Sequence, residues 1–279
     1  SFGDFIAISG IVDETCAKLI KREVSDGIIA LGYTDEALSI LKTKKKNNYI
    51  ILSANKNINY NRTEYREIMG VSLSQQCNNE LVNYSYFDNV PTKNKLLSNV
   101  KQLKDDLILA TITLKYTPSN SISIVNNGIV IGIGAGQQNR VDCIKLAGNK
   151  ANLYRLRRHP KCVKLLTLFK DNVKRQDKTN ALINYIHGDI TDKQLELFKN
   201  KPEALSQTEK KTFLDSLNDN LSLSSDAFFP FRDNIDYASN YYIKCILNPG
   251  GSIQDDNIII ACNEYDISMA ISNKRMFLH

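Results

Sequence analysis

At 279 residues, the chain is long enough for one large domain or two of ordinary size. Its composition, 42% apolar and 24% charged, is that of a globular protein, and the net charge of +6 is spread along the chain. Basic clusters such as Lys44–Lys46 lie in polar, helix-like segments and indicate solvated surface rather than a nucleic-acid-binding track. A mildly basic protein suits small anionic substrates. No apolar run approaches membrane-spanning length, so we expect neither a nucleic-acid nor a membrane partner.

The cysteines are scattered, with no C-x-x-C pair and no histidine at zinc spacing. Several lie inside apolar runs, which favours reduced thiols in the core and a cytosolic location. The six positions are Cys16, Cys77, Cys143, Cys162, Cys245 and Cys262.

The first fifty residues alternate between strand and helix patterns, which predicts an α/β layer with crossover connections. Asp26 lies in a turn that leads into the second strand. It is either a turn former or an acceptor at the sheet edge, and local sequence favours the turn former. The expected elements are a buried strand Phe5–Ser9, a helix capped by Asp13 and ending at Arg22, a strand Ile28–Leu31, a helix Glu36–Lys44 capped by Thr34 or Asp35, and a strand Tyr49–Leu52.

Residues 55–100 show little periodicity, and a buried helix is expected next, over Leu103–Tyr116. Two β-branched runs, Ile122–Val125 and Ile129–Ile133, follow and are joined through Asn127-Gly128. Asn-Gly between two such runs is a strong hairpin signal, because both central residues of the favoured turn need positive φ. The second strand leads through Gly-Ala-Gly-Gln-Gln to a helix over Arg140–Arg158. Such a stretch is typical of a ligand-binding sheet edge.

Helical patterns dominate from about residue 165 to 220, including Asp192–Phe198 and Thr208–Leu217. Ser206 and Glu209 have the spacing of a capping box before the second of these. His159, before Pro160, is expected to be a helix-end residue with a local hydrogen bond rather than a catalytic one.

The segment Ser224–Asn234 places three phenylalanines around a proline, between charged residues. It is either an aromatic clamp for a flat ligand or a structural loop with buried aromatic side chains, and composition does not separate the two. After it we expect a strand Ile243–Leu247, a mostly helical segment Asp255–Tyr265 and a strand Ile267–Ile271.

Common nucleotide and hydrolase motifs are absent from the sequence. Gly132, Gly134 and Gly136 are spaced two apart, so they do not form G-x-G-x-x-G, and a hairpin precedes them instead of a βαβ strand. No G-x-x-x-x-G-K-[S/T] or G-x-S-x-G occurs, and the H-x-E and P-C-x-x-C motifs of zinc deaminases are missing.

The sequence resembles one family along its whole length. The residues that carry the resemblance are Ser1–Phe5, Arg22–Ala30, Lys115–Ser121, Gly132–Arg140, Ser224–Asn234 and the end from Arg275 to His279. They are similar to the folate-dependent AICAR transformylases, the C-terminal part of the bifunctional purine-biosynthesis enzyme that also carries IMP cyclohydrolase.

The resemblance implies an α/β fold of tandem cytidine-deaminase-like α/β/α units without zinc. Residues 1–78 would be the C-terminal part of a first, incomplete unit, and residues 79–279 a second unit with a helical insert at about 165–222. It also implies a homodimer with shared active sites. The implied reaction is transfer of the formyl group of 10-formyltetrahydrofolate, the co-substrate, to the 5-amino group of AICAR in purine biosynthesis.

The resemblance assigns roles residue by residue. Asn120 matches the catalytic amide that orients formyl transfer. Nucleotide (AICAR) contacts match Gly3, Asp26, Asn120, Phe228, Arg275 and His279, with Arg275 near the phosphate. Folate contacts match Phe2, Arg140, Val141, Asn180, Pro230 and Phe231. Thr117, Ser119, Ser121 and Asp226 resemble the oxygen-rich region where the family can hold potassium.

One departure from the family pattern concerns the catalytic Lys-His pair, which lies upstream of Ser-Phe-Gly-Asp-Phe in the family. The sequence begins at this motif and has no internal Lys-His dipeptide. The expectation is therefore a fragment that holds most of the binding pocket without the proton-transfer residues and without the cyclohydrolase domain. Two hypotheses follow: part of a formyltransferase, or a non-catalytic module that binds nucleotide and folate.

Overall fold

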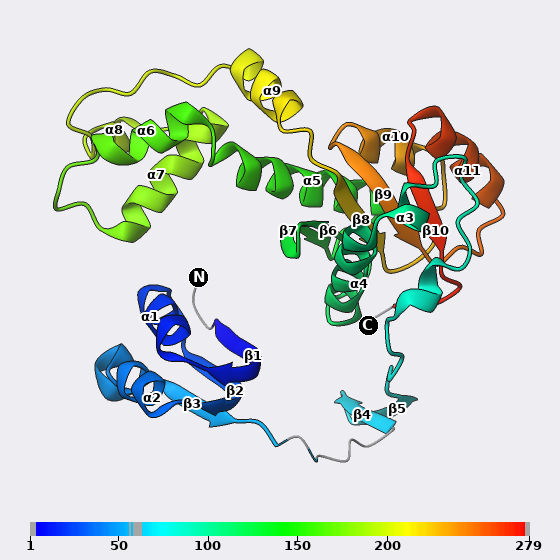
Figure 1. The fold of residues 1–279 in the computed structure, drawn as a ribbon, viewed down its shortest axis with the longest axis horizontal. Coiled ribbons are helices and arrows are strands. Elements are labelled where there is room, and N and C mark those ends of the chain that lie inside the picture. The colour runs from blue at the N-terminus through cyan, green and yellow to red at the C-terminus, as the bar shows by residue number, and fades with distance from the viewer. Residues whose placement is uncertain (1–3, 56, 58–62, 277–279) are drawn as a thin grey trace. The chain divides into compact units, whose positions relative to one another are not determined.

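The computed structural model describes residues 4–55, 57 and 63–276. The chain divides into two compact units, residues 1–77 and residues 78–279, which we describe separately (Figure 1). The mixture of helices with parallel and mixed sheets confirms the α/β class. Phe2, Gly3 and His279, to which the resemblance assigned roles, lie outside the described residues.

The first unit is built on a parallel three-stranded sheet in the order β1-β2-β3. Asp13 caps the first helix through the Cys16 amide, as the sequence predicts, and of the two caps expected for the second helix it is Thr34 that accepts from the Ala37 amide. The elements are β1 (Phe5–Val12), α1 (Glu14–Arg22), β2 (Gly27–Tyr33), α2 (Asp35–Lys42), the short 3-10 helix Lys44–Asn47 and β3 (Ile50–Ser53).

The expectation that the first strand is buried was wrong for one of its sides. Val12 packs with both helices in the core of this unit, but Phe5 and Ile11 remain 47% and 71% exposed. Successive side chains of a strand point to opposite faces, and these two lie on the side away from the core formed with α1 and α2.

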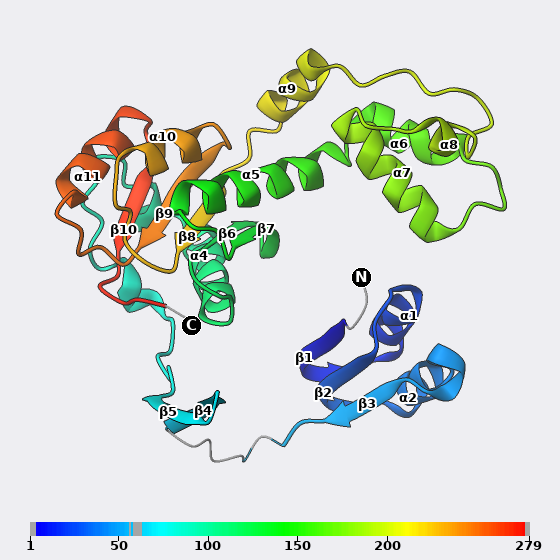
Figure 2. The ribbon, with the colours of Figure 1, turned by 180° about the vertical axis from the view of Figure 1, so that it is seen from behind.

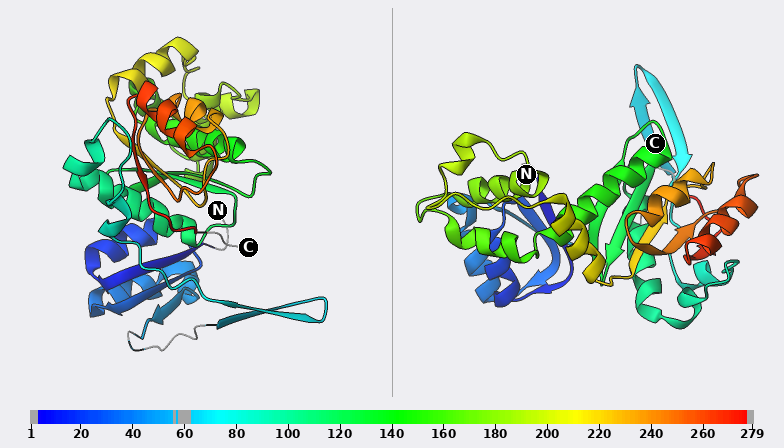
Figure 3. Two further views of the ribbon diagram at one scale, coloured as in Figure 1. Left: turned by 90° about the vertical axis from the view of Figure 1, so that its right-hand side faces the viewer. Right: turned by 90° about the horizontal axis from the view of Figure 1, so that it is seen from above.

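A β-hairpin that the sequence analysis did not predict follows β3 along the chain. Its strands are β4 (Thr63–Ile68) and β5 (Val71–Gln76), and both residues of its turn, Met69 and Gly70, have positive φ. It forms a separate two-stranded sheet, visible as a ribbon in Figure 3.

The second unit contains a five-stranded sheet in the order β10-β9-β8-β6-β7. Strands β8, β9 and β10 run parallel, and β6 pairs antiparallel with both β7 and β8. The strands are β6 (Ser121–Asn126), β7 (Ile129–Ala135), β8 (Leu221–Ser225), β9 (Ile243–Asn248) and β10 (Ser268–Ile271). The central β8 was not predicted.

Helices cover both faces of this sheet, giving three layers (Figures 1 and 2). One buried cluster joins the strands to α5, α10 and α11, and another joins them to α4, α3 and a 3-10 helix. The bounds are Tyr84–Phe87 for the 3-10 helix, α3 (Leu96–Asn99), α4 (Lys101–Lys115), α5 (Arg140–Leu156), α10 (Asp233–Ser239) and α11 (Asp255–Glu264). The sequence did not predict α10.

The predicted Asn127-Gly128 turn is confirmed, with φ of 50° and 75°. Its two backbone amides donate to the buried carboxylate of Asp106 on α4, at 2.9 and 2.7 Å. Helix α4 thereby fixes the end of the hairpin that carries the Gly132–Ala135 segment.

The remaining helices of this unit form a cluster of their own, to which α5 leads from the sheet (Figures 1 and 2). His159 caps the first of them through the Lys161 amide at 3.1 Å, and the capping box of Ser206 and Glu209 is present. The predicted helix Asp192–Phe198 is shorter. The elements are α6 (Pro160–Leu168), α7 (Arg175–His187), α8 (Asp192–Leu195) and α9 (Gln207–Ser216).

Candidate functional site

The glycines before α5 allow this helix to pack directly on β7. A Cβ at Gly134 would overlap the Cys143 carbonyl of α5, and one at Gly132 would overlap the Ala147 carbonyl. Gly132 and Gly134 are two residues apart, which does not match a dinucleotide-binding motif. This spacing instead allows α5 to pack closely on β7. Because α5 lies so near the sheet, its first residue, Arg140, reaches the start of β6.

Arg140 lies in a buried polar network at this edge of the sheet. Its Nη1 forms an ion pair with Asp226, at the end of β8, and donates to Ser225 Oγ at 3.0 Å. Its Nη2 donates to Asn120 Oδ1 at 2.9 Å. Arg140 and Asp226 are 6% and 0% exposed, so the guanidinium is held by protein acceptors on several sides.

This contact orients the Asn120 amide. A guanidinium can only donate, so the amide oxygen must face Arg140 and the amide nitrogen must face the other way. There, among the residues that the structure describes, Nδ2 makes one long bond, 3.4 Å, to the Gln137 carbonyl. The half-buried side chain is thus prepared to donate to an acceptor brought to it.

A cavity of about 420 Å³ opens beside this network. Four of the residues that the resemblance assigns to folate, Arg140, Val141, Pro230 and Phe231, line it. Asn180 does not; it lies on α7, exposed to solvent. Six further lining residues received no role from the resemblance, although three of them lie in the quoted segments Gly132–Arg140 and Ser224–Asn234: Asn139, Asp142, Lys145, Asp233, Asn234 and Tyr237.

Lys145 is the most informative of the residues that the sequence analysis missed. Its ammonium lies 4.4 Å from the centroid of the Tyr237 ring and 3.5 Å from an oxygen of Asp142. Its position one turn after Arg140 and Val141 on the predicted helix was the available signal. The contact of Lys145 with Tyr237 had no such signal in the sequence, because helix α10, which carries Tyr237, was not predicted.

Of the residues assigned to AICAR, Phe228 and Arg275 come together. The Arg275 guanidinium lies 5.4 Å from the Phe228 ring centroid, a cation–π distance. Asp26 belongs to the first unit, where it forms an ion pair with Lys45, and its backbone bonds to Asp4, just before β1, and to Ile50 of β3. These contacts are compatible with both interpretations of Asp26, a turn former and an acceptor at the sheet edge.

The residues proposed for potassium offer oxygen atoms only. Ser121 Oγ and Asp226 Oδ2 are buried without a hydrogen-bond partner in the described part of the chain. Ser119 is half-buried, and the Thr117 hydroxyl donates to the Thr113 carbonyl at 2.7 Å and retains acceptor capacity. Hard cations prefer such oxygen ligands, so the set fits an alkali ion. Residues 4–55, 57 and 63–276 contain no group of three or more His, Cys, Asp or Glu that could hold a metal.

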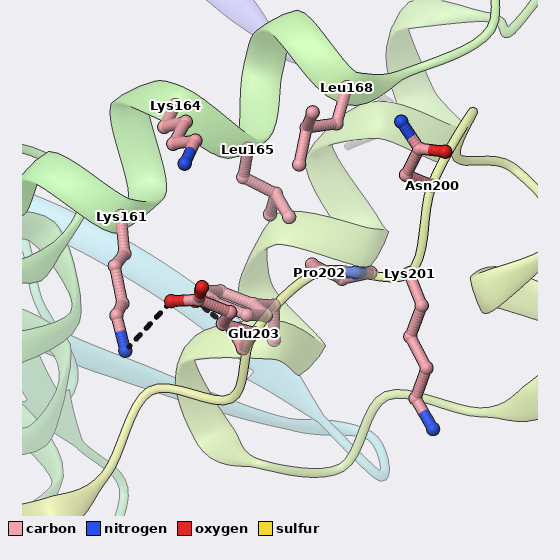
Figure 4. A pocket seen from close by; sticks show the side chains of 9 residues that line it. Lys161, Lys164, Leu165, Leu168, Asn200, Lys201, Pro202 and Glu203 are labelled. Atoms are coloured by element: carbon pink, nitrogen blue, oxygen red, sulfur yellow. Dashed lines mark hydrogen bonds and ion pairs between the residues drawn. The ribbon is translucent and has the colours of Figure 1, made fainter.

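A different cavity, of about 340 Å³, lies in the helical cluster between α6, α7 and the segment before α9 (Figure 4). It is lined by three lysines, but Lys161 is already paired with Glu203 and Glu209, at 3.7 and 2.7 Å. Figure 4 shows the Lys201 side chain extending away from Lys164. The charges therefore do not converge on this cavity.

The cysteines are free, as predicted, and four of them are buried. Burial raises the pKa of the Cys143 thiol, which donates to the Asn120 carbonyl at 3.0 Å. No helix in the described residues combines the length and apolar character needed to cross a bilayer.

Comparison with known proteins identifies the family. The model of the AICARFT/IMPCHase bienzyme family matches residues 1–150, more than half of the chain. The chain belongs to this family.

Curated AICARFT/IMPCHase relatives align with the whole chain. They include the bifunctional purine biosynthesis protein PurH of Buchnera aphidicola subsp. Baizongia pistaciae (31% identical), of Buchnera aphidicola subsp. Schizaphis graminum (30%) and of Persephonella marina (28%). In each case the alignment covers 100% of this chain and 41% of the relative, so the chain spans about two fifths of the length of these proteins.

Proposed function

We propose that the protein to which this chain belongs transfers the formyl group of 10-formyltetrahydrofolate to the 5-amino group of AICAR, giving formyl-AICAR, as a cytosolic enzyme of purine biosynthesis. Family membership supports the proposal. The observation that carries it is the Asn120 amide, oriented by Arg140 beside a cavity that four of the folate-assigned residues line.

The proposed role of Asn120 follows from the direction of its amide. The 5-amino group of AICAR is a poor nucleophile, because its lone pair is delocalised into the ring that bears the carboxamide. Attack on the formyl carbon places negative charge on the formyl oxygen, and a prepositioned N–H donor stabilises that charge. Asn120 Nδ2 is such a donor, because its oxygen is held by Arg140.

The folate co-substrate is proposed to occupy the 420 Å³ cavity. Phe231, which is 64% exposed, and Pro230 offer an apolar wall for a flat ring, and the Val141 backbone lies at the N-terminus of α5. The Phe228–Arg275 pair is proposed to hold the nucleotide, with the Arg275 cation near its phosphate. A bound potassium ion would supply positive charge that orients the oxygens of Ser121 and Asp226.

Three further features are part of the proposal. The two units are tandem cytidine-deaminase-like folds, the first of them incomplete, with a helical insert at about 165–222. Two copies assemble with shared active sites. Residues 1–279 contain no Lys-His dipeptide, and the proposal assigns to them the binding of both substrates rather than the movement of the proton.

The first experiment assays formylation of AICAR by the full-length protein and by Asn120→Ala. Removing one prepositioned oxyanion donor costs about 10²- to 10³-fold in kcat. Unchanged turnover in this variant would contradict the role of the amide, and a wild-type protein without turnover would contradict the proposed function.

A double-mutant cycle tests whether Arg140 acts through Asn120. If it does, Arg140→Lys lowers kcat in the wild-type background but has little further effect on kcat in Asn120→Ala. Additive losses in kcat would show that the two residues act separately. An accompanying rise in the folate KM would show that Arg140 also contacts the ligand.

The alternative function, a non-catalytic binding module, is tested with a protein that consists of residues 1–279. Calorimetry with AICAR, beside a turnover assay on the same sample, separates the two cases. Binding without formylation supports the module for this segment, and turnover excludes it.

A further inference from the structure

A second cavity on α5 is separate from the proposed active site. Its volume is about 500 Å³, within the range of small-molecule sites. It lies between the C-terminal half of α5, helix α9 and the end of α10. Its lining residues include Asn152, Gln207, Lys210, Asp215, Asn240 and Tyr242. Asn152 lies twelve positions after Arg140 on α5, about 18 Å along the helix at the α-helical rise.

Lys210 is the residue that points to a ligand. The residue is only 8% exposed, but its ammonium is not among the buried unpartnered atoms, so it reaches the surface of the cavity, where it forms no ion pair with any residue that the structure describes. The apolar stem of this lysine is buried and its charged head stays at the cavity surface, where it is available to an anion. The nearby Cys162 thiol is no counter-ion, because burial raises its pKa to about 11.

The single carboxylate of the cavity is already used. One oxygen of Asp215 is bound to Lys211 at 2.7 Å and the other accepts from the Tyr242 hydroxyl at 2.7 Å. The two lysines and one aspartate of the lining leave one formal positive charge, which lies on Lys210.

Two amide side chains line the cavity together with this charge. Asn152 Oδ1 accepts from the Nη1 of the buried Arg155 at 3.3 Å, so the Asn152 amide nitrogen is directed away from that arginine. The Gln207 side chain adds a second amide to the lining. An ammonium with amide donors is an arrangement that binds oxyanions, to which lysine contributes as a point charge.

We propose that this cavity binds the oxyanion group, phosphate or carboxylate, of a small metabolite, with Lys210 as its counter-ion. The proposal goes beyond formyl transfer and does not depend on it, because none of the residues assigned to AICAR, folate or potassium lines this cavity. The shared chemistry of phosphate and carboxylate defines the site, and the experiment distinguishes them.

The test titrates the full chain with inorganic phosphate and, separately, with citrate, by calorimetry at constant ionic strength. Lys210→Met, which retains an apolar stem, is expected to lower the affinity about tenfold or more. Lys199→Met is the control: its ammonium is exposed, is paired with Asp171 and lies outside this cavity, so the affinity changes little. Arg275→Met is expected to retain binding, which separates this site from the proposed nucleotide phosphate site.

A second variant, Asn240→Asp, tests the site if Lys210→Met fails to fold. It adds a negative charge at an exposed position of the cavity, so it should weaken anion binding without disturbing the core. Binding of phosphate alone, or of citrate alone, supports the site and identifies the head group. Absence of binding by both anions, or wild-type affinity in Lys210→Met or Asn240→Asp, overturns the proposal.

Discussion

Replacing Asp226 by asparagine tests the buried ion pair on which the candidate site depends. The side chains of Arg140 and Asp226 are 5% and 0% exposed, so water cannot take over the role of the lost carboxylate. Asparagine has nearly the same shape but no charge. The variant therefore leaves the guanidinium without its counter-ion and disturbs little else.

The expected loss is large. Removing one partner of a buried ion pair costs about 3–5 kcal/mol, a sizeable part of the roughly 5–15 kcal/mol by which a domain is stable. In a unit of the size of residues 78–279, each 1 kcal/mol shifts Tm by about 2–4 °C. Asp226→Asn should thus lower Tm by about 6–20 °C.

Thermal unfolding of residues 1–279 measures this, with Asp171→Asn as the control. Asp171 is also paired with a lysine, Lys199 at 2.9 Å, but its side chain is 94% exposed. Exposed pairs contribute about 0–1 kcal/mol, so the control should unfold near the wild-type temperature. Removing both charges, in Arg140→Met/Asp226→Leu, should cost less than Asp226→Asn alone. Equal, small losses in the two aspartate variants would refute the argument from burial.

Three further changes test the packing and the electrostatics. Gly134→Ala forces α5 away from β7 and should cost about 1–3 kcal/mol in urea unfolding, whereas Gly10→Ala, with no atom near the added methyl, should cost far less. Leu107→Ala empties a fully buried position under the sheet and should cost about 2–5 kcal/mol by the same measurement. The hydrogen bond from Lys161 lowers the pKa of Glu209 from 4.5 to about 2, so its contribution to stability is complete above pH 4.5 and is lost as the pH falls toward 2. Glu209→Gln should flatten the dependence of Tm on pH in that window, and an unchanged slope would contradict the assignment.

Local signals predicted those elements whose ends are determined by nearby residues. Asn127-Gly128 adopts the positive φ values that its turn requires, and Asp13, Thr34 and Ser206 cap helices where the sequence places them. Each of these features depends on hydrogen bonds within a few residues, and that is why the sequence alone was sufficient.

The central strand β8 was missed for the opposite reason. Its sequence, Leu-Ser-Leu-Ser-Ser, has a weak intrinsic strand preference, and it follows a long helical segment. It is nevertheless fully buried, because β6 and β9 pair with it on both sides. Ser224, for example, exchanges a 2.8 Å hydrogen bond with Thr111 of α4. Only the tertiary fold explains why these serines form a core strand.

The candidate site was predictable as a list of residues but not as a network. Asn120 and Arg140 stand in one stretch, and the resemblance connected them with separate ligands. Their mutual hydrogen bond, and the ion pair of Arg140 with Asp226, which lies 86 positions further along the chain, depend on the pairing of β6 with β8. Ser225, a further acceptor at the guanidinium, belonged to a quoted motif but received no role.

Helix α5 connects these observations, because buried arginines fix it near both ends. Arg140 is paired with Asp226 at the N-terminus, and Arg155, 0% exposed, is bound to Asp219 at 3.1 Å near the C-terminus. Between them the helix rests directly on the glycines of β7 and has no room to move toward the sheet. The direction of the Asn120 amide therefore depends on the position of α5. A substitution along the α5–β7 contact should therefore change the formyl transfer that we propose, because it changes the direction of this amide.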